Sequence, residues 1–94
     1  MDANQPSIVK TIRAMGGSWQ GTHQIPGALD GIIGYRGVDV RVEIKDPEQP
    51  KSKRKLSDAE QDVFDEWRGR KPVKIETNAD VVKLFHQINM ERTK

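Results

Sequence analysis

Hydrophobic and polar residues alternate most regularly in VDVRVEIKD, residues 38–46. Positions 38, 40, 42 and 44 are valine or isoleucine, and positions 39, 41, 43 and 45 are charged. A period of two predicts a β-strand with one buried face and one solvated face. The preceding run LDGIIGY, residues 29–35, is also typical of a strand. Arg36-Gly37 lies between the two runs, so the pattern favours a hairpin closed by a two-residue turn.

Apolar residues recur at helical spacing in three other parts of the chain. Residues 7–15 predict a helix that Ser7 caps and Gly16-Gly17 ends. A second helix is expected to begin at Ser57, because SDAE is a capping box with Glu60 three residues after the cap. We expect this second helix to bury Val63, Phe64 and Trp67.

The third helix is expected after TNAD, residues 77–80, and its apolar positions are Val81, Val82, Phe85 and Ile88. SWQGTHQI, residues 18–25, and PVKIE, residues 72–76, are shorter strand candidates. Residues 46–56 contain two prolines and a run of charges, which predicts an exposed loop. The expected order is therefore α-β-β-β-α-β-α, a mixed β-sheet flanked by helices in the α/β class.

Composition limits the size and setting of the protein. Ninety-four residues, about a third of them hydrophobic, predict a single domain over residues 1–94 with a small core. The net charge of +2 is too small to indicate a nucleic-acid partner by itself, and there is no cysteine for a disulfide or a thiolate metal site. No apolar run approaches the ~20 residues that span a membrane, and the N-terminus does not resemble a signal peptide. We expect a soluble, cytoplasmic protein.

The hairpin places three charged residues together. If Arg36-Gly37 is the turn, Asp30 lies opposite Glu43, and Lys45 lies two residues further along the same face. Carboxylates directly opposite in a sheet repel each other unless the site is wet, one acid is protonated, or a cation lies between them. Mg²⁺ is such a cation, because it binds one or two carboxylates together with water and substrate phosphate.

Two interpretations remain open at this point. A register shift of one residue would move Asp30 to the opposite face and separate it from Glu43. Glu-x-Lys is also a common pattern by chance, and it then marks only a solvated strand face. The alternation alone therefore predicts a shared face and not a reaction.

The order of motifs along the chain resembles a nuclease family. ALDG, followed by EIK, resembles the Asp…Glu-x-Lys core of the PD-(D/E)XK nuclease superfamily. SKRKLSDAEQDVFDEWRG is similar to the basic loop and helix that follow this core in small stand-alone phage VRR-NUC proteins. DANQPSIVKTIRAMGG and VKIETNADVVKLFHQI resemble the first helix and the closing strand and helix of that group. The resemblance covers nearly the whole chain and implies a restriction-endonuclease-like core.

The resemblance implies a divalent-metal-dependent, structure-specific DNA endonuclease that hydrolyses phosphodiester bonds. Its implied cofactor is Mg²⁺, with Mn²⁺ as a substitute, and its implied substrate is branched DNA such as a Holliday junction, cut by a homodimer. A phage or prophage protein acting in a bacterial host is expected. The alternatives are a flap, nicking or less selective nuclease of the same chemistry, and a non-catalytic DNA-binding module with the same fold.

The resemblance also implies roles for individual residues. Asp30 and Glu43 would bind the metal together with the backbone carbonyl of Ile44. Lys45 would position or activate water, and Gln61 would support the site near the lysine. The first helix of the family often carries an acidic metal ligand, and here Gln5 stands at that position. A neutral amide is a weaker ligand for Mg²⁺ than a carboxylate.

Basic residues outside this core are candidates for DNA contact. Four of the five residues from 51 to 55 are basic, namely Lys51, Lys53, Arg54 and Lys55. A second basic group comprises Arg68, Arg70 and Lys71. Contacts from these side chains to phosphates would be sensitive to salt and independent of base sequence. The alternative is that both groups are only solvated charge runs.

Overall fold

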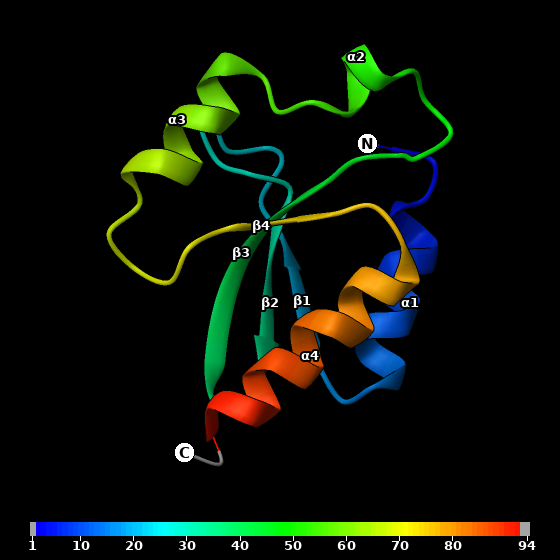
Figure 1. Cartoon of the computed structure of the whole chain (residues 1–94), viewed down its shortest axis with the longest axis vertical. Helices are drawn as coiled ribbons and strands as arrows, with labels where there is room; N and C mark the ends of the chain where they lie inside the picture. The colour runs from blue at the N-terminus through cyan, green and yellow to red at the C-terminus, as the bar shows by residue number, and fades with distance from the viewer. Residues whose placement is uncertain (1, 93–94) are drawn as a thin grey trace.

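The computed structural model describes residues 2–92 of the chain, which form four helices and one four-stranded sheet (Figure 1). In chain order they are α1 Gln5–Ala14, β1 Ser18–Gly21, β2 Gly31–Tyr35, β3 Val38–Ile44, α2 Lys51–Arg54, α3 Asp58–Glu66, β4 Val73–Ile75 and α4 Asn78–Arg92. The expected order is confirmed with one addition, because the loop at residues 46–56 contains the single turn α2. None of the helices within residues 2–92 is long and apolar enough to cross a membrane.

The sheet is mixed, as expected, with the strand order β1-β2-β3-β4. β1, β2 and β3 are antiparallel neighbours, and β4 lies parallel to β3. A parallel neighbour cannot be reached by a tight turn, so the chain between β3 and β4 must return along the sheet. This crossover carries α2 and α3, and it passes over the end of the sheet at which β3 finishes (Figure 1).

The hairpin register is confirmed, since the paired residues run from Gly31 opposite Val42 to Tyr35 opposite Val38. Arg36 and Gly37 have φ angles of 50° and 82°, and a tight hairpin turn of this type needs positive φ at both central positions. The ladder ends before Leu29 and Ile44, which the same register would pair. The side chain of Asp30 ends it by accepting the N–H of Ile44 at 2.8 Å.

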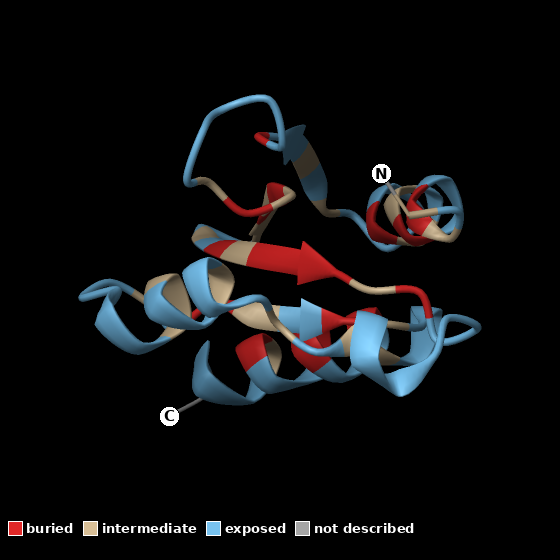
Figure 2. Cartoon of the chain, turned by 90° about the horizontal axis from the view of Figure 1, so that it is seen from above, coloured by how far each residue is buried: buried red, intermediate tan, exposed pale blue. Residues whose placement is uncertain are grey.

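The hydrophobic core lies between one face of the sheet and the pair of helices α1 and α4 (Figures 1 and 2). Its buried members are Ile8 and Ile12 of α1, Ile33, Val40, Val42, Ile44 and Ile75 of the sheet, and Val81, Leu84, Phe85 and Ile88 of α4. The rings of Tyr35 and Phe85 stack with centroids 3.8 Å apart. The alternating strand residues therefore face the core, as their period of two predicts.

The start of α1 differs from the prediction. The helix begins at Gln5 with Pro6 in its first turn, so the predicted cap at Ser7 is wrong and Ser7 lies inside the helix. Proline is favoured in the first turn, because its missing N–H would have no partner there. Asn4 precedes the helix, and its side-chain amide donates hydrogen bonds to the carbonyls of Lys45 and Glu76.

The expected buried face of α3 is also wrong. None of the residues of α3 is buried, and Trp67, which follows the helix, remains 40% exposed. In α4, Val82 is 49% exposed, whereas the other three predicted positions are buried. Helical spacing identified both helices, but α1 and α4 already fill the core side of the sheet. Figure 2 shows α3 on the outside of the molecule, where its residues are exposed or intermediate.

Candidate active site

Asp30 and Glu43 lie together where β2 begins and β3 ends. The backbone N–H of Asp30 donates to Glu43 Oε1 at 3.2 Å, and the N–H of Ile44 donates to Asp30 Oδ2 at 2.8 Å. Glu43 is buried, with 6% of its surface exposed. The two carboxylates are therefore cross-strand neighbours, as the hairpin register predicted.

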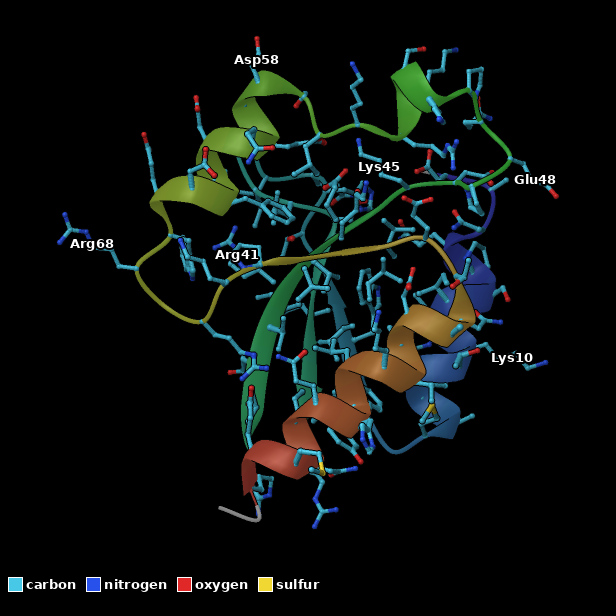
Figure 3. All side chains as sticks on the ribbon, viewed as in Figure 1. Lys10, Arg41, Lys45, Glu48, Asp58 and Arg68 are labelled. Carbon is cyan, nitrogen blue, oxygen red and sulfur yellow. The ribbon has the colours of Figure 1, made fainter. Side chains whose placement is uncertain are left out.

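Lys45 completes this group from the residue after β3. Its Nζ lies 3.5 Å from Glu43 Oε2 and 2.9 Å from Glu60 Oε1, and its side chain is 13% exposed. Figure 3 shows Lys45 between the end of the sheet and the crossover with α2 and α3. The lysine thus links the strand carboxylate to the helix that covers the site.

Glu60 also belongs to this cluster, although the sequence predicted for it only a role in the helix cap. The capping box is present: Glu60 Oε1 accepts the N–H of Ser57 at 2.8 Å, and Ser57 Oγ accepts the N–H of Glu60 at 3.2 Å. The same oxygen of Glu60 also accepts a hydrogen bond from Lys45. The capping box in the sequence was a signal for the position of Glu60, but nothing local indicated its contact with the lysine.

Gln61, the predicted supporting residue, is turned away from Lys45. Its side-chain amide donates to Asp65 Oδ1 at 2.9 Å, one turn along α3, and the residue is exposed. Consecutive residues of a helix point about 100° apart, so Glu60 and Gln61 cannot both face the sheet. The structure therefore brings Glu60 to the lysine and leaves Gln61 on the outer face.

The environment of Glu43 favours its protonated form. Burial, the hydrogen bond shared with the carboxyl group of Glu60, and the negative charges of Asp30 and Glu60 together raise the pKa of Glu43 from 4.5 to about 8. The positive charge of Lys45 acts in the opposite direction but does not outweigh these effects. A buried carboxyl group beside two other acids is difficult to ionise unless additional positive charge approaches.

Glu60 and Lys45 remain charged in the same cluster. Burial alone would raise the pKa of Glu60, but hydrogen bonds with Glu43, Ser57 and Lys45 lower it to about 2. Burial tends to lower the pKa of Lys45, but the hydrogen bond and charge of Glu60, followed by those of Glu43, leave it raised. Two carboxyl groups in one cluster thus have different protonation preferences, a pattern that often accompanies catalytic sites.

The cluster contains carboxylate oxygens, the ligand type that hard divalent cations such as Mg²⁺ prefer. Lys45 contacts two of the three acids, Glu43 and Glu60, and the negative charge of Asp30 also disfavours the ionised form of Glu43. Within residues 2–92, no three His, Cys, Asp or Glu side chains form a group that could hold a metal by themselves. Asp30 and Glu43 are two carboxylates, and Mg²⁺ commonly uses one or two carboxylates together with water and phosphate. The N–H of Ile44 points to Asp30, so its carbonyl points to the same edge of β3.

Gln5, the predicted additional ligand, is buried on α1 at 5% exposure. Its Oε1 is enclosed and has no hydrogen-bond partner among the described residues. Among residues 2–92, no hydrogen bond joins Gln5 to Asp30 or Glu43. Instead, Gln5 lines a groove between α1 and β1 that also contains Trp19.

The first basic group lies along the crossover. Lys51, Lys53 and Lys55 are exposed, whereas Arg54 is partly buried and lies 3.6 Å from Glu76 Oε2. A groove of about 280 Å³ lies beside this group. It is lined by Lys51, Arg54 and Lys55 of the crossover and by Lys74 and Glu76. The crossover therefore places this basic group on the same end of the sheet as the carboxylates, as Figure 1 shows.

The second basic group is divided between solvent and structural contacts. Arg68 extends into solvent (Figure 3). Arg70 binds Glu91 of α4 through hydrogen bonds of 2.7 and 3.3 Å. Lys71 donates to the carbonyls of Phe64 and Asp65 at the end of α3. Arg70 and Lys71 thus hold the loop before β4 against α4 and α3.

Comparisons of the chain with protein-family models, with curated proteins and with solved structures found no match. The cluster formed by Asp30, Glu43, Lys45 and Glu60 is the feature of the chain that points most directly to a chemical role.

Proposed function

We propose that the protein is a divalent-metal-dependent DNA endonuclease. The main observation is that Asp30, Glu43 and Lys45 meet at one end of the β2–β3 hairpin, with both carboxylates hydrogen-bonded across the strands. The mixed sheet, in which β4 lies parallel to β3, agrees with the restriction-endonuclease-like core that the sequence resemblance implies. The basic crossover beside the cluster suits a polyanionic substrate.

Each residue of the cluster has a role in this proposal. Asp30, Glu43 and the carbonyl of Ile44 would hold the metal ion. A bound Mg²⁺ or Mn²⁺ would stabilise charge on the scissile phosphate and lower the pKa of a metal-bound water. Lys45 orients the attacking water and stabilises the negative charge that develops on the phosphate. Glu60 holds Lys45 in position through their 2.9 Å hydrogen bond.

The proposed substrate is branched DNA, such as a four-way junction, cut by a homodimer. A chain of 94 residues covers little DNA alone, and a two-fold dimer would present two sites to a roughly two-fold substrate. Lys51, Lys53 and Lys55 contact the phosphates in this proposal, and their exposure on the crossover supports it. Arg68 contacts a further phosphate in this proposal, whereas Arg70 and Lys71 already have structural contacts.

The central test compares Asp30→Asn with Asp39→Asn on labelled junctions, flaps, duplexes and single strands, in Mg²⁺, Mn²⁺ or EDTA. The side-chain carbonyl of the substituted asparagine can still accept the N–H of Ile44, so the fold should persist while metal binding is lost. We expect Asp30→Asn to lose about 100-fold or more in cleavage rate, equal to about 3 kcal/mol of transition-state stabilisation. Asp39 is an exposed carboxylate in the same hairpin, so its variant should cleave like the wild type.

Three results would contradict parts of the proposal. Cleavage in EDTA, or equal activity of Asp30→Asn, would exclude the proposed site. Binding of DNA without cleavage of any substrate would favour a non-catalytic DNA-binding module. Sedimentation of the junction complex as a protein monomer would remove the two-site interpretation and favour a flap or nicking nuclease.

A further inference from the structure

A groove of about 500 Å³ lies between α1 and the edge strand β1. It is lined by Gln5, Pro6, Val9, Lys10, Arg13 and Trp19. Its lining combines apolar surface, a flat aromatic ring, one buried amide and two cations. Its volume falls in the range of small-ligand sites, about 300–1,000 Å³.

The indole of Trp19 packs over Gly31, whose missing side chain leaves room for the ring. Gly21 and Gly31 are paired across β1 and β2, two residues from Trp19 on the same face. A Cβ added to Gly31 would lie 2.3 Å from the ring carbon Cη2 of Trp19, so a larger residue could not occupy that position without moving the indole. One side of the indole therefore rests on the sheet, while the residue remains partly exposed in the groove.

Polar groups in the groove have hydrogen-bonding and charge capacity that the chain itself does not use. The enclosed Oε1 of Gln5 lacks a donor among the described residues, and buried acceptors are normally satisfied. Lys10 and Arg13 are exposed one turn apart on α1, and neither forms an ion pair within residues 2–92. Figure 3 shows Lys10 projecting from α1 into solvent.

We infer that this groove binds one unpaired nucleotide of a DNA strand. The base stacks on the free side of Trp19, and Lys10 and Arg13 bind its flanking phosphates. Gln5 lines the same groove and would lie close to the bound base. Stacking on an aromatic ring beside a basic track is the general means of binding single-stranded nucleic acid.

The position of the groove relates it to the candidate active site. Trp19 contacts the position of Gly31, and the preceding residue is Asp30, whose Cα is about 3.8 Å further along the chain. A strand that leaves the carboxylate cluster around the β1 edge would reach the groove. This inference rests on the proposed nuclease function and specifies its substrate as DNA with an unpaired nucleotide beside the cleaved bond.

Binding of a short single-stranded oligodeoxynucleotide in EDTA tests the groove without cleavage. We expect Trp19→Leu to weaken binding about tenfold or more, and Trp19→Phe to retain most of the affinity. Arg13→Gln should weaken binding and reduce its salt dependence, whereas Lys83→Gln, a matched loss of one exposed charge on α4, should have little effect. Because Arg13 is exposed, its variant tests the groove even if Trp19→Leu does not fold.

NMR spectroscopy locates the bound base directly. The chain has two tryptophans, so the indole N–H signal of Trp67 serves as an internal reference for that of Trp19. The oligonucleotide should shift the signals of the Trp19 indole and the Gln5 amide and leave Trp67 unchanged. An abasic strand of equal charge should bind at least several-fold more weakly and should not shift the Trp19 signal.

The possible outcomes separate this inference from the nuclease proposal. Unchanged affinity in Trp19→Leu and Arg13→Gln, or equal binding of the abasic strand or of an acidic peptide, would overturn the groove assignment even if the protein cleaves DNA. Base-dependent binding at Trp19 without any cleavage would support the groove and exclude the nuclease function.

Discussion

The helices α3 and α4 show how differently two helices with similar apolar spacing can be attached to one sheet. α4 buries Val81, Leu84, Phe85 and Ile88 against the strands, whereas no residue of α3 is buried. Each helix carries one of the two phenylalanines of the chain, and Phe85 is 1% exposed while Phe64 is only partly covered. α4 therefore belongs to the frame of the domain, and α3 does not.

Polar contacts hold α3 in place. They include the Lys45–Glu60 ion pair, the hydrogen bonds from Lys71 to the last carbonyls of the helix, and Arg41, whose guanidinium lies 4.2 Å from the Trp67 ring centroid. The contacts of Lys71 and of Arg41 with Trp67 lie at the surface and contribute about 1 kcal/mol or less each, whereas the Lys45–Glu60 pair is largely covered. The position of α3 is therefore tied to the charge state of the candidate active site.

The largest expected difference is between Phe85→Ala and Phe64→Ala. Loss of Phe85 leaves a cavity among Tyr35, α1 and α4, so we expect a loss of about 3–5 kcal/mol in the free energy of unfolding. Phe64→Ala should cost about 1 kcal/mol, because less apolar surface is removed from the interior. Urea denaturation followed by far-ultraviolet circular dichroism measures both, and equal losses would mean that α3 belongs to the core.

The second expected effect is pH dependence at the end of the sheet covered by α3. The pKa of Glu43 is raised to about 8 in the folded state, against a usual value of 4.5. The folded state then binds more protons than the unfolded state between these values, so this group lowers stability as pH rises from about 4.5 to 8. Glu43→Gln should flatten that slope in denaturation measured at several pH values. A slope unchanged by the substitution would contradict a protonated Glu43.

The same group should make metal binding depend on pH. In the proposed function a metal ion would compete with the proton on Glu43, so affinity for Mg²⁺ should rise about tenfold per pH unit below pH 8 and level off above it. Glu60→Gln removes a neighbouring charge but preserves the capping box, which accepts glutamine at this position. In calorimetric titrations of Glu60→Gln, the Mg²⁺ affinity should therefore level off at a lower pH than in the wild type. If the Mg²⁺ affinity levels off at the same pH in both proteins, Glu60 of α3 does not influence the proposed metal site.

A smaller effect is expected for the capping residue. Ser57→Ala removes the side chain that accepts the N–H of Glu60, at an expected cost of about 1 kcal/mol. Because α3 buries no residue, the loss should appear as faster hydrogen exchange in α3, while exchange in α4 stays unchanged. Faster exchange in both helices would show that they unfold as one unit.

The smallest effect is expected for Trp67→Leu. The variant keeps an apolar side chain but removes the ring over which Arg41 lies, so stability should fall by about 0.5–1 kcal/mol. Thermal denaturation measures this change, and Arg41→Gln combined with Trp67→Leu should cost less than the sum of the single changes. Full additivity would show that the contact contributes nothing to the attachment of α3.

Local patterns in the sequence were sufficient for the hairpin and for much of the site. The period of two and the two-residue turn determined the register of the hairpin, and at its open end Asp30 contacts Glu43, which lies beside Lys45. The capping box determined where α3 begins. These features depend on neighbouring residues or on one short turn, so the physical rules that govern them can be applied without knowledge of the rest of the fold.

Tertiary structure alone decided which helical residue reaches Lys45. Glu60 and Gln61 are adjacent, and the choice between them depends on how the crossover directs α3 over the sheet. Long-range packing also explains why Trp67 is exposed. The core contains side chains of α1, the sheet and α4, and none from α3 or Trp67. The groove at Trp19 likewise forms only when β1, β2 and α1 meet. Helical and strand periodicity specify a face, and long-range packing decides what that face contacts.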